Sequence, residues 1–424
     1  MLNKFIKILS SRKEFCIKSF GQSMLPLFSQ TSILYYKRIK FLQTKVNDLI
    51  LVKKDNILFT HRVIYKTDKY LITKGDNNLI SDGRIYPKQI VGKAYQIKRG
   101  IHIINPEDIY LFQSTQYFRE IVKITQRFEK EKIEYVFLKG LPLHLYFEKI
   151  HPKRIYADAD LLISKTDRNK VKKILVSLDF KQANTSYSSI HKKLKDKDTE
   201  VLFYKKLGVF FVNLDIHLEA GFLFNQLGRL DSLYKEKYID EITDQFIKSR
   251  KYVHIQNNYF PILLYDWLVI YLCLHFFHHN FRGIYRLELA DSVIRKKFVN
   301  KGANIWIDVE EKIIKYKLQN FVYPSFLLLK KYSHTPLPSN FLNSIKPNSH
   351  KINFIKNNIL SENIFDDETR MEAGVKRFKN LYYLSPNPLY IRLLVFLNIQ
   401  VIYSFFWVMI FLLRRSVKSI LKSF

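Results

Sequence analysis

The chain has 424 residues, of which 47% are hydrophobic and 15% aromatic, so it is long enough for two or three domains with sizeable cores. It carries 70 Lys and Arg against 38 Asp and Glu, and this formal net charge of +32 favours anionic partners such as lipid headgroups, nucleotides or RNA. The only two cysteines, Cys16 and Cys273, are far apart in the chain, which fits a reducing compartment and argues against a disulfide scaffold or a cysteine-rich zinc site.

The N-terminal quarter predicts a small all-β domain. Residues 1–14 are basic and only mildly apolar, and they lack the continuous apolar run and cleavage site of a secretory signal. From residue 15 to residue 100, short β-like runs alternate with turn residues. The boundary of this domain is predicted at Arg99-Gly100 and at the NPED segment of residues 105–108.

Three polar motifs stand out in this quarter. Ser23 lies in GQSMLP (residues 21–26), His61 lies in THRVI (residues 60–64), and Asp76 and Asp82 lie in TKGDNNLISD (residues 73–82). A serine needs a neutral imidazole to take its proton and a carboxylate to orient the ring, so these residue types together indicate a hydrolase if they meet in space. Each motif taken singly has a simpler explanation. Asp-Asn-Asn, for example, is first a turn signal.

These motifs resemble the signal peptidase I superfamily over residues 15–100. GQSMLP resembles its small-x-Ser-Met-x-Pro motif, and THRVI resembles the histidine-base subtype of the endoplasmic reticulum, archaea and some Gram-positive bacteria. VGKA at residues 91–94 resembles its closing strand, whereas Asn47 stands where glycine is usual. The resemblance implies a serine endopeptidase that acts on a peptide or preprotein without a cofactor. Ser23 would be the nucleophile, and its N–H would be one oxyanion donor. His61 would be the general base and Asp82 the preferred orienting acid, with Asp76 as the alternative.

The hydrophobic period changes after residue 114. Helical spacing covers residues 118–128, and further helices and strands alternate as far as the LDIH segment of residues 214–217. Beyond residue 252 the pattern is mostly helical. We therefore expect an α/β domain over residues 115–300 and a helical extension over residues 301–388.

A second group of polar residues lies in the α/β domain. Asp158 and Asp160 flank Ala159 at the start of an apolar run, so a strand would place both carboxylates on one face. Asp215, on a later strand, would add a third carboxylate. Such a cluster is suited to Mg²⁺ and to the phosphates of a nucleoside triphosphate. The simpler reading is that Asp-x-Asp pairs are common and usually solvated.

This layout resembles a bacterial branch of the polymerase-β-type nucleotidyltransferase superfamily. The matching segments are LKG at residues 138–140, RIYADADLLI at residues 154–163, LDIH at residues 214–217, and HFFHH at residues 275–279 followed by Arg286 and Asp291. The resemblance implies that Lys139, Gly140 and Arg154 bind the nucleotide. It also implies that Asp158, Asp160 and Asp215 hold Mg²⁺. Gly140 follows lysine where many relatives have Gly-Ser, and a domain that binds without catalysing is the alternative. His275 and His279 are expected to be a core pair rather than zinc ligands.

The C-terminal segment is strongly apolar. Residues 393–413 carry no charge, and basic residues such as Arg392 and Arg414 flank them. That length is sufficient to cross a membrane, so a membrane-associated helix is expected over residues 389–415, with a packed helix as the alternative. This predicts localisation at the cytoplasmic membrane, without fixing the side on which each domain lies.

The sequence thus predicts a bifunctional, membrane-associated bacterial protein, with a peptidase and a nucleotidyltransferase-like domain, for maturation of a peptide precursor. The alternative is a nucleotidyltransferase whose N-terminal domain only recognises peptides. Nucleic acid as a partner has no motif to support it. A self-cleaving repressor is disfavoured because neither a lysine base nor a helix-turn-helix is visible.

Overall fold

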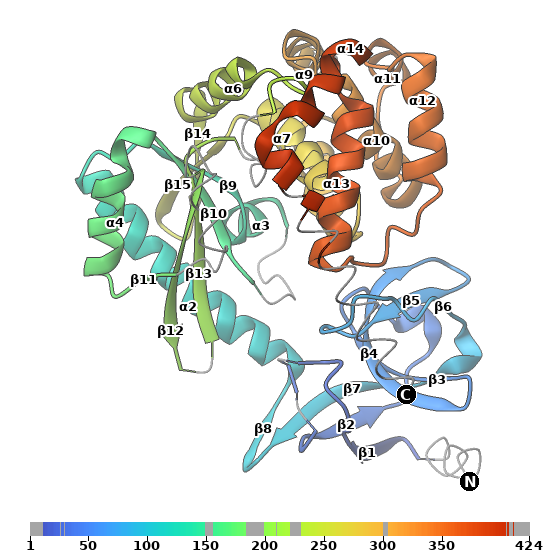
Figure 1. Cartoon of the computed structure of the whole chain (residues 1–424). Helices are drawn as coiled ribbons and strands as arrows, with labels where there is room; N and C mark the ends of the chain where they lie inside the picture. Colours follow the sequence, from blue (N-terminus) through green and yellow to red (C-terminus); the bar gives the residue numbers. More distant parts are fainter. Residues whose placement is uncertain are drawn as a thin grey trace.

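The protein is described here from a computed structural model that contains two β-sheets and a large helical part (Figure 1). The described residues are 12–25, 27–28, 30–148, 156–183, 199–208, 210–220, 230–299, 304–403, 405–406 and 410. Residues 1–11, Pro26 and Arg154, on which sequence-based interpretations rest, lie outside these ranges.

The N-terminal part is an eight-stranded sheet in the order β1-β2-β7-β3-β4-β5-β6, with β8 paired to β7. All its strand pairs are antiparallel, and Asp55 and Asn56 have positive φ at the tight β3–β4 turn, as hairpin turns require. The β-rich N-terminal region expected from the sequence is therefore confirmed. Its strands are β1 (Glu14–Lys18), β2 (Ile33–Lys37), β3 (Leu49–Lys54), β4 (Ile57–Lys66), β5 (Leu71–Lys74), β6 (Arg84–Ile85), β7 (Ile90–Arg99) and β8 (His102–Ile104).

Helix α2 (Pro106–Lys130) occupies the predicted domain boundary. Pro106 is its first residue and Asn105 precedes it in extended conformation, so the NPED turn signal is the start of a helix rather than a linker. Ile109 and Tyr110 pack in the core of the β domain, whereas Tyr117 and later residues of the same helix pack in the second core. One uninterrupted helix thus belongs to both cores.

The second sheet has seven strands in the order β11-β12-β13-β10-β9-β15-β14. At its centre β10 pairs with β13 in parallel, which aligns Asp160 with Asp215. Helix α2 lies along β13 and packs against α4 (Arg168–Ser177), as Figure 1 shows. The strands are β9 (Tyr135–Lys139), β10 (Ala159–Ile163), β11 (Lys181–Gln182), β12 (Glu200–Leu207), β13 (Phe210–His217), β14 (Arg250–Ile255) and β15 (Asn258–Leu263).

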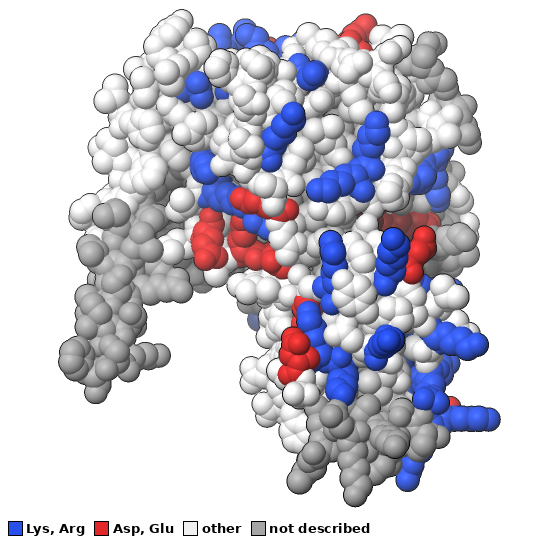
Figure 2. All heavy atoms as spheres, turned by 90° about the vertical axis from the view of Figure 1, so that its right-hand side faces the viewer, with Lys and Arg blue, Asp and Glu red and all other residues white. Residues whose placement is uncertain are grey.

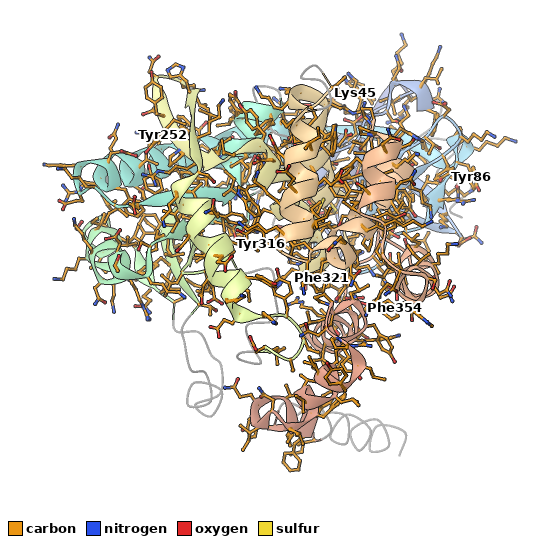
Figure 3. All side chains as sticks on the ribbon, turned by 90° about the horizontal axis from the view of Figure 1, so that it is seen from above. Lys45, Tyr86, Tyr252, Tyr316, Phe321 and Phe354 are labelled. Carbon is orange, nitrogen blue, oxygen red and sulfur yellow. The ribbon has the colours of Figure 1, made fainter. Side chains whose placement is uncertain are left out.

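The remaining helices form most of the C-terminal half. Helix α7 is buried along nearly its whole length, which explains its lack of a polar face. Seen from above, Tyr252 of β14 and Tyr86 of the β domain lie at opposite ends of the molecule, with Tyr316 and Phe321 between them (Figure 3). The helices are α3 (Leu141–Phe147), α6 (Glu236–Lys248), α7 (Tyr265–His278), α8 (Tyr285–Lys297), α9 (Asn304–Lys315), α10 (Gln319–Leu328), α11 (Ser339–Ser344), α12 (Ser349–Ile355), α13 (Arg370–Leu384) and α14 (Leu389–Leu393).

The apolar C-terminal segment differs from the predicted continuous helix. After α14 the chain makes a 3₁₀ turn at Leu394–Leu397, and Asn398 is extended with φ −73° and ψ 118°. The Asn398 side chain accepts hydrogen bonds from the N–H groups of Gln400 (2.9 Å) and Val401 (3.3 Å), so this polar residue starts a new turn instead of continuing the old one. The prediction of a single helix over residues 389–415 is therefore wrong for its described part. Across the described residues, no helix combines the length and the apolarity that a membrane span needs.

The β domain and the helical part are joined by a short acidic segment. Asp366 accepts hydrogen bonds from the N–H (2.8 Å) and hydroxyl (2.7 Å) of Ser81. The next residue, Asp367, donates its N–H to the Leu79 carbonyl (2.6 Å) and pairs with Lys74. Apolar contacts add to this junction, since Ile72 of β5 is buried in the core of the second domain.

Candidate functional site

Three carboxylates meet at one end of the central parallel strand pair. Asp158 directly precedes β10, Asp160 lies in β10, and Asp215 lies beside it in β13. One oxygen of each carboxylate lies within 4.8 Å of the others. The structure thus brings together the three residues predicted to hold Mg²⁺, and an all-oxygen donor set is the kind that this ion prefers.

Burial and mutual repulsion shift the pKa values of these carboxylates. Burial, together with the charges of Asp160 and Asp158, raises the pKa of Asp215 to about 8. Burial and the Asp160 charge also raise the pKa of Asp158. Burial acts in the same direction on Asp160, but the adjacent Lys139 and His217 outweigh it and lower the pKa of this carboxyl. Asp158 and Asp215 therefore lack enough positive charge nearby to stabilise their ionised forms. A bound divalent cation would supply that charge.

Lys139 and Gly140 lie beside this cluster. The Lys139 ammonium is 3.0 Å from Asp160 and 3.7 Å from Asp158, and these two charges raise the pKa of Lys139 against the opposing effect of its burial. Gly140 precedes α3 with φ +103°, a conformation that residues with a Cβ rarely adopt. Glycine is therefore needed to turn the chain from β9 into α3. Arg154, the third predicted nucleotide-binding residue, lies outside the described residues.

His217 is a site residue that the sequence reading did not assign. Its Nε2–H donates to Asp160 Oδ1 at 3.0 Å, so Asp160 is held between an imidazole and an ammonium. The signal was present in the sequence, because His217 follows Asp215 by two positions and strand side chains alternate with period two.

The paired histidines of α7 form a buried group. His275 and His279 face each other with their Nε2 atoms 3.2 Å apart. Burial lowers the pKa of each well below its usual range, and nearby cations act in the same direction. This arrangement fits the expectation of a core pair. Asp291 of α8 pairs with Arg295 (2.9 Å) and accepts from Thr335 (2.7 Å), so it serves a local contact there.

In the β domain, Ser23, His61 and Asp82 form a hydrogen-bonded chain. The Asp82 Oδ2 atom lies 2.8 Å from Nδ1 of the buried His61, and the Nε2 atom of the same ring lies 2.9 Å from Ser23 Oγ. Because a carboxylate can only accept, Nδ1 of the neutral ring carries the proton and Nε2 is free to accept the serine proton. Thr73 also donates to Asp82 Oδ2 (2.7 Å), which orients that carboxylate.

Asp76, the alternative orienting acid, lies in a different contact. Its two oxygens accept hydrogen bonds from Nε (2.7 Å) and Nη2 (2.6 Å) of Arg62. Burial opposes the charge of Arg62, but Asp76 outweighs it and raises the pKa of this guanidinium. Arg62 also donates to Tyr110 of α2, so the pair ties β4 to the shared helix.

The loop that contains Asp76 packs directly on the serine loop. The Asn77 N–H donates to the Ser23 carbonyl (2.8 Å), and a Cβ at Gly75 would lie only 2.7 Å from that same oxygen. Glycine at position 75 is therefore required by close approach. Asn47, which stands where glycine is usual, has φ +74°, and asparagine tolerates this left-handed conformation better than most residues.

The fold and the acidic cluster define a nucleotidyltransferase-like protein, in which a mixed sheet presents three carboxylates beside a lysine. The family described as "Uncharacterised nucleotidyltransferase" matches residues 108–334, more than half of the chain, and the chain belongs to this family. The match begins after the β domain, so it carries no information on the likeness of residues 15–100 to signal peptidases.

A crystal structure of an antigenic nucleotidyltransferase-like protein from Paracoccidioides brasiliensis is similar with 13% sequence identity and a TM-score of 0.30, over 52% of this chain and 94% of that chain. No curated protein matches the chain.

Proposed function

We propose that this protein transfers a nucleotidyl group from a nucleoside triphosphate to an acceptor. The observation that carries the proposal is the convergence of Asp158, Asp160 and Asp215 within 4.8 Å beside Lys139, in a chain of the nucleotidyltransferase family. Mg²⁺ held by these carboxylates would supply the positive charge that the triphosphate needs during transfer.

The residues of the chain have distinct parts in this reaction. Lys139 and His217 fix the orientation of Asp160, so that the carboxylate is already placed when substrate arrives. The acceptor oxygen attacks the α-phosphorus and its proton passes to a carboxylate of the cluster. The bond to the β-phosphate oxygen then breaks, and pyrophosphate leaves with the electron pair.

The test is Mg²⁺-dependent release of pyrophosphate from a mixture of nucleoside triphosphates. We expect release by the wild-type protein and its loss in the double variant Asp158→Ala/Asp160→Ala. Asp179→Asn is the matched control, because this aspartate of the same domain has a side chain that is 87% exposed. Equal release in the wild type and the double variant would refute the assignment.

A second candidate function is favoured by the triad geometry. We propose that the β domain is a serine endopeptidase in which the Ser23 oxygen attacks a peptide carbonyl and its proton passes to His61 Nε2. Asp82 holds the ring by its Nδ1–H, and the protonated ring then gives the proton to the leaving amine. Water releases the acyl group from Ser23 in the second half of the reaction. The competing reading is a β domain that recognises peptides without cleaving them.

Labelling with a fluorophosphonate probe separates these two readings. We expect covalent labelling of the wild-type protein, and none in Ser23→Ala. His61→Ala should strongly reduce the labelling rate, because the serine would lose its base. If the wild type is not labelled while its fold is intact, the recognition module is the better description.

A further inference from the structure

A polar cavity of about 380 Å³ lies between the β domain and the helical part. Residues Asp76 and Asn77, from the loop that packs on Ser23, line one side of it. Arg282 in the turn between α7 and α8, Arg286 at the start of α8 and Arg377 of α13 line the other side. Basic and acidic side chains gather where the surface is hollowed between the upper and lower parts of the molecule (Figure 2).

The carboxylates of this cavity are paired with cations, and one of these cations, Arg282, also lines the cavity. Asp76 is bound through both oxygens by Arg62. Asp367 pairs with Lys74, and Glu368 lies between Lys376 (3.0 Å) and Arg282 (3.4 Å) and accepts from Asn280 at 2.7 Å. Arg282 also binds Glu362, so its charge is largely offset, and the positive charge that favours an anion in this cavity is chiefly that of Arg286.

Arg286 is the arginine of this cavity that is best placed to bind an anion. Its Nη1 donates to the Arg282 carbonyl (2.9 Å) and is 3.6 Å from Asp367, and its guanidinium lies 4.5 Å from the centre of the Tyr285 ring. Its Nε and Nη2 groups make no hydrogen bond with any residue in the described ranges. The guanidinium is thus held in place on one side while two donors remain available.

Gly283 makes this placement possible. It has φ +79°, and a Cβ there would lie 2.2 Å from Arg286 Nη1. Its N–H donates to the Ile364 carbonyl (2.8 Å), which fixes the turn against the acidic segment. The positive φ favours glycine at this position, and a Cβ there would also displace the Arg286 guanidinium.

The charge of Arg286 also acts on the buried histidines beside the cavity. Three neighbouring histidines, His275, His278 and His279, have pKa values well below the usual range, first because of burial. The charges of Arg286 and Lys139 lower the pKa of all three further. Arg286 is therefore close enough to these buried rings to disfavour a second positive charge beside it.

We propose that this cavity is a binding site for a polyphosphate, with Arg286 as its main ligand-binding residue. A planar guanidinium with two donors on one edge matches two phosphate oxygens, whereas the carboxylates of the cavity wall are already paired. Two sources share this chemistry: the triphosphate chain of the transferase substrate and a separate phosphorylated ligand. The first source rests on the proposed transferase function, but the site itself does not.

The test is calorimetric binding of tripolyphosphate to the full-length protein without Mg²⁺, so that activity is not the readout. We expect Arg286→Gln to weaken binding about tenfold or more, because a charge-assisted bidentate contact is lost. Arg286→Lys should recover only part of the affinity, since it keeps the charge but loses the fork. Arg295→Gln is the matched control on the same helix, where the arginine pairs with Asp291.

The outcomes are distinct. Equal binding in the wild type and Arg286→Gln, an equal loss in Arg295→Gln, or no binding at all would overturn the site. The site would also be refuted if Asp158→Ala/Asp160→Ala lost tripolyphosphate binding while Arg286→Gln bound it normally. The phosphates would then bind at the acidic cluster instead. ATP that displaces tripolyphosphate supports the site and assigns it to the nucleotide, whereas simultaneous binding supports a separate ligand. Failure of pyrophosphate release would refute the transferase but leave these binding results standing.

Discussion

At the scale of single residues, both candidate sites depend on how closely neighbouring groups approach one another. In the proposed triad, Asp82 orients the ring of His61 and is itself held by Thr73, and in the acidic cluster Asp160 is held between Lys139 and His217. In each site a second layer of hydrogen bonds orients the group that would do the chemistry.

Gly75 tests the importance of close approach in the serine loop. Gly75→Ala would place a Cβ 2.7 Å from the Ser23 carbonyl oxygen, so one of the two loops must move. We expect the rate of fluorophosphonate labelling to fall by roughly 10²-fold, the effect of a displacement of about 1 Å at a reacting group. Gly100→Ala is the control for backbone strain alone, because Gly100 has φ +62° but a Cβ in this β7–β8 turn meets nothing within 4 Å. Unchanged labelling in Gly75→Ala would contradict the argument.

Asp215 makes Mg²⁺ binding depend on pH. Its raised pKa of about 8 means that the folded, metal-free protein keeps a proton that the unfolded chain has lost above about pH 4. The stability of the metal-free protein should therefore fall as the pH rises from about 4 to 8, and Asp215→Asn should remove this dependence. Because Mg²⁺ must displace the same proton, its affinity should rise up to about tenfold per pH unit below pH 8 and then level off.

Calorimetry at about pH 6 and about pH 9 measures this effect through both affinity and released protons. Asp240→Asn is the control, since this aspartate has a half-exposed side chain away from the cluster's carboxylates and pairs with Lys165. An affinity that does not change with pH would show that Asp215 is ionised before the metal binds.

At the scale of elements, the segment around Asp366 fixes the loop that contains the triad acid. Ser81 donates both its N–H and its hydroxyl to Asp366, and the next residue is Asp82. Asp366→Ala would leave the Ser81 N–H without this acceptor and loosen the loop. We expect the maximal rate of labelling to fall about tenfold while the concentration of probe for half-maximal rate is unchanged.

Asp366→Asn should largely restore the rate, because its side-chain oxygen still accepts from Ser81. Asp291→Ala is a control in the helical part, where the aspartate binds Arg295 and Thr335 instead. If Asp366→Ala and Asp291→Ala slowed labelling equally, a general loss of stability would explain both.

At the scale of the whole molecule, the β domain and the helical part are expected to unfold together. Helix α2 belongs to both cores, and Tyr65 packs its ring against Phe365 (5.1 Å) and Tyr332 (6.1 Å) across the junction. All three tryptophans of the chain lie outside the β domain, so their fluorescence reports on the rest of the molecule.

Ile50 tests this coupling. It is fully buried in the β domain, so Ile50→Ala should cost about 2 to 5 kcal/mol of unfolding free energy. If the parts are coupled, denaturant unfolding followed by tryptophan fluorescence should shift to a lower midpoint. Ile57→Ala, at an isoleucine that is 61% exposed, should change stability by less than about 0.5 kcal/mol. An unchanged tryptophan transition in Ile50→Ala would mean that the β domain unfolds on its own.

The sequence by itself determined the local patterns. Period-two runs and turn residues predicted the β-rich N-terminal region, and the Asp158-Ala159-Asp160 spacing placed two carboxylates together because strand side chains alternate. The motifs around Ser23, His61 and Asp82 identified the residue types of a triad, and their catalytic role stays a prediction. These signals are readable because each depends on residues only a few positions apart.

Only the tertiary structure decided which distant groups meet. Strand register and loop packing placed Asp82 rather than Asp76 on His61, aligned Asp215 with Asp160, and brought Asp366 to Ser81. It also placed one continuous helix at the predicted domain boundary after Asn105, and it interrupted the apolar C-terminal segment at Asn398. The physical reason is that these outcomes depend on close approach between segments up to hundreds of residues apart, which no local period in the sequence encodes.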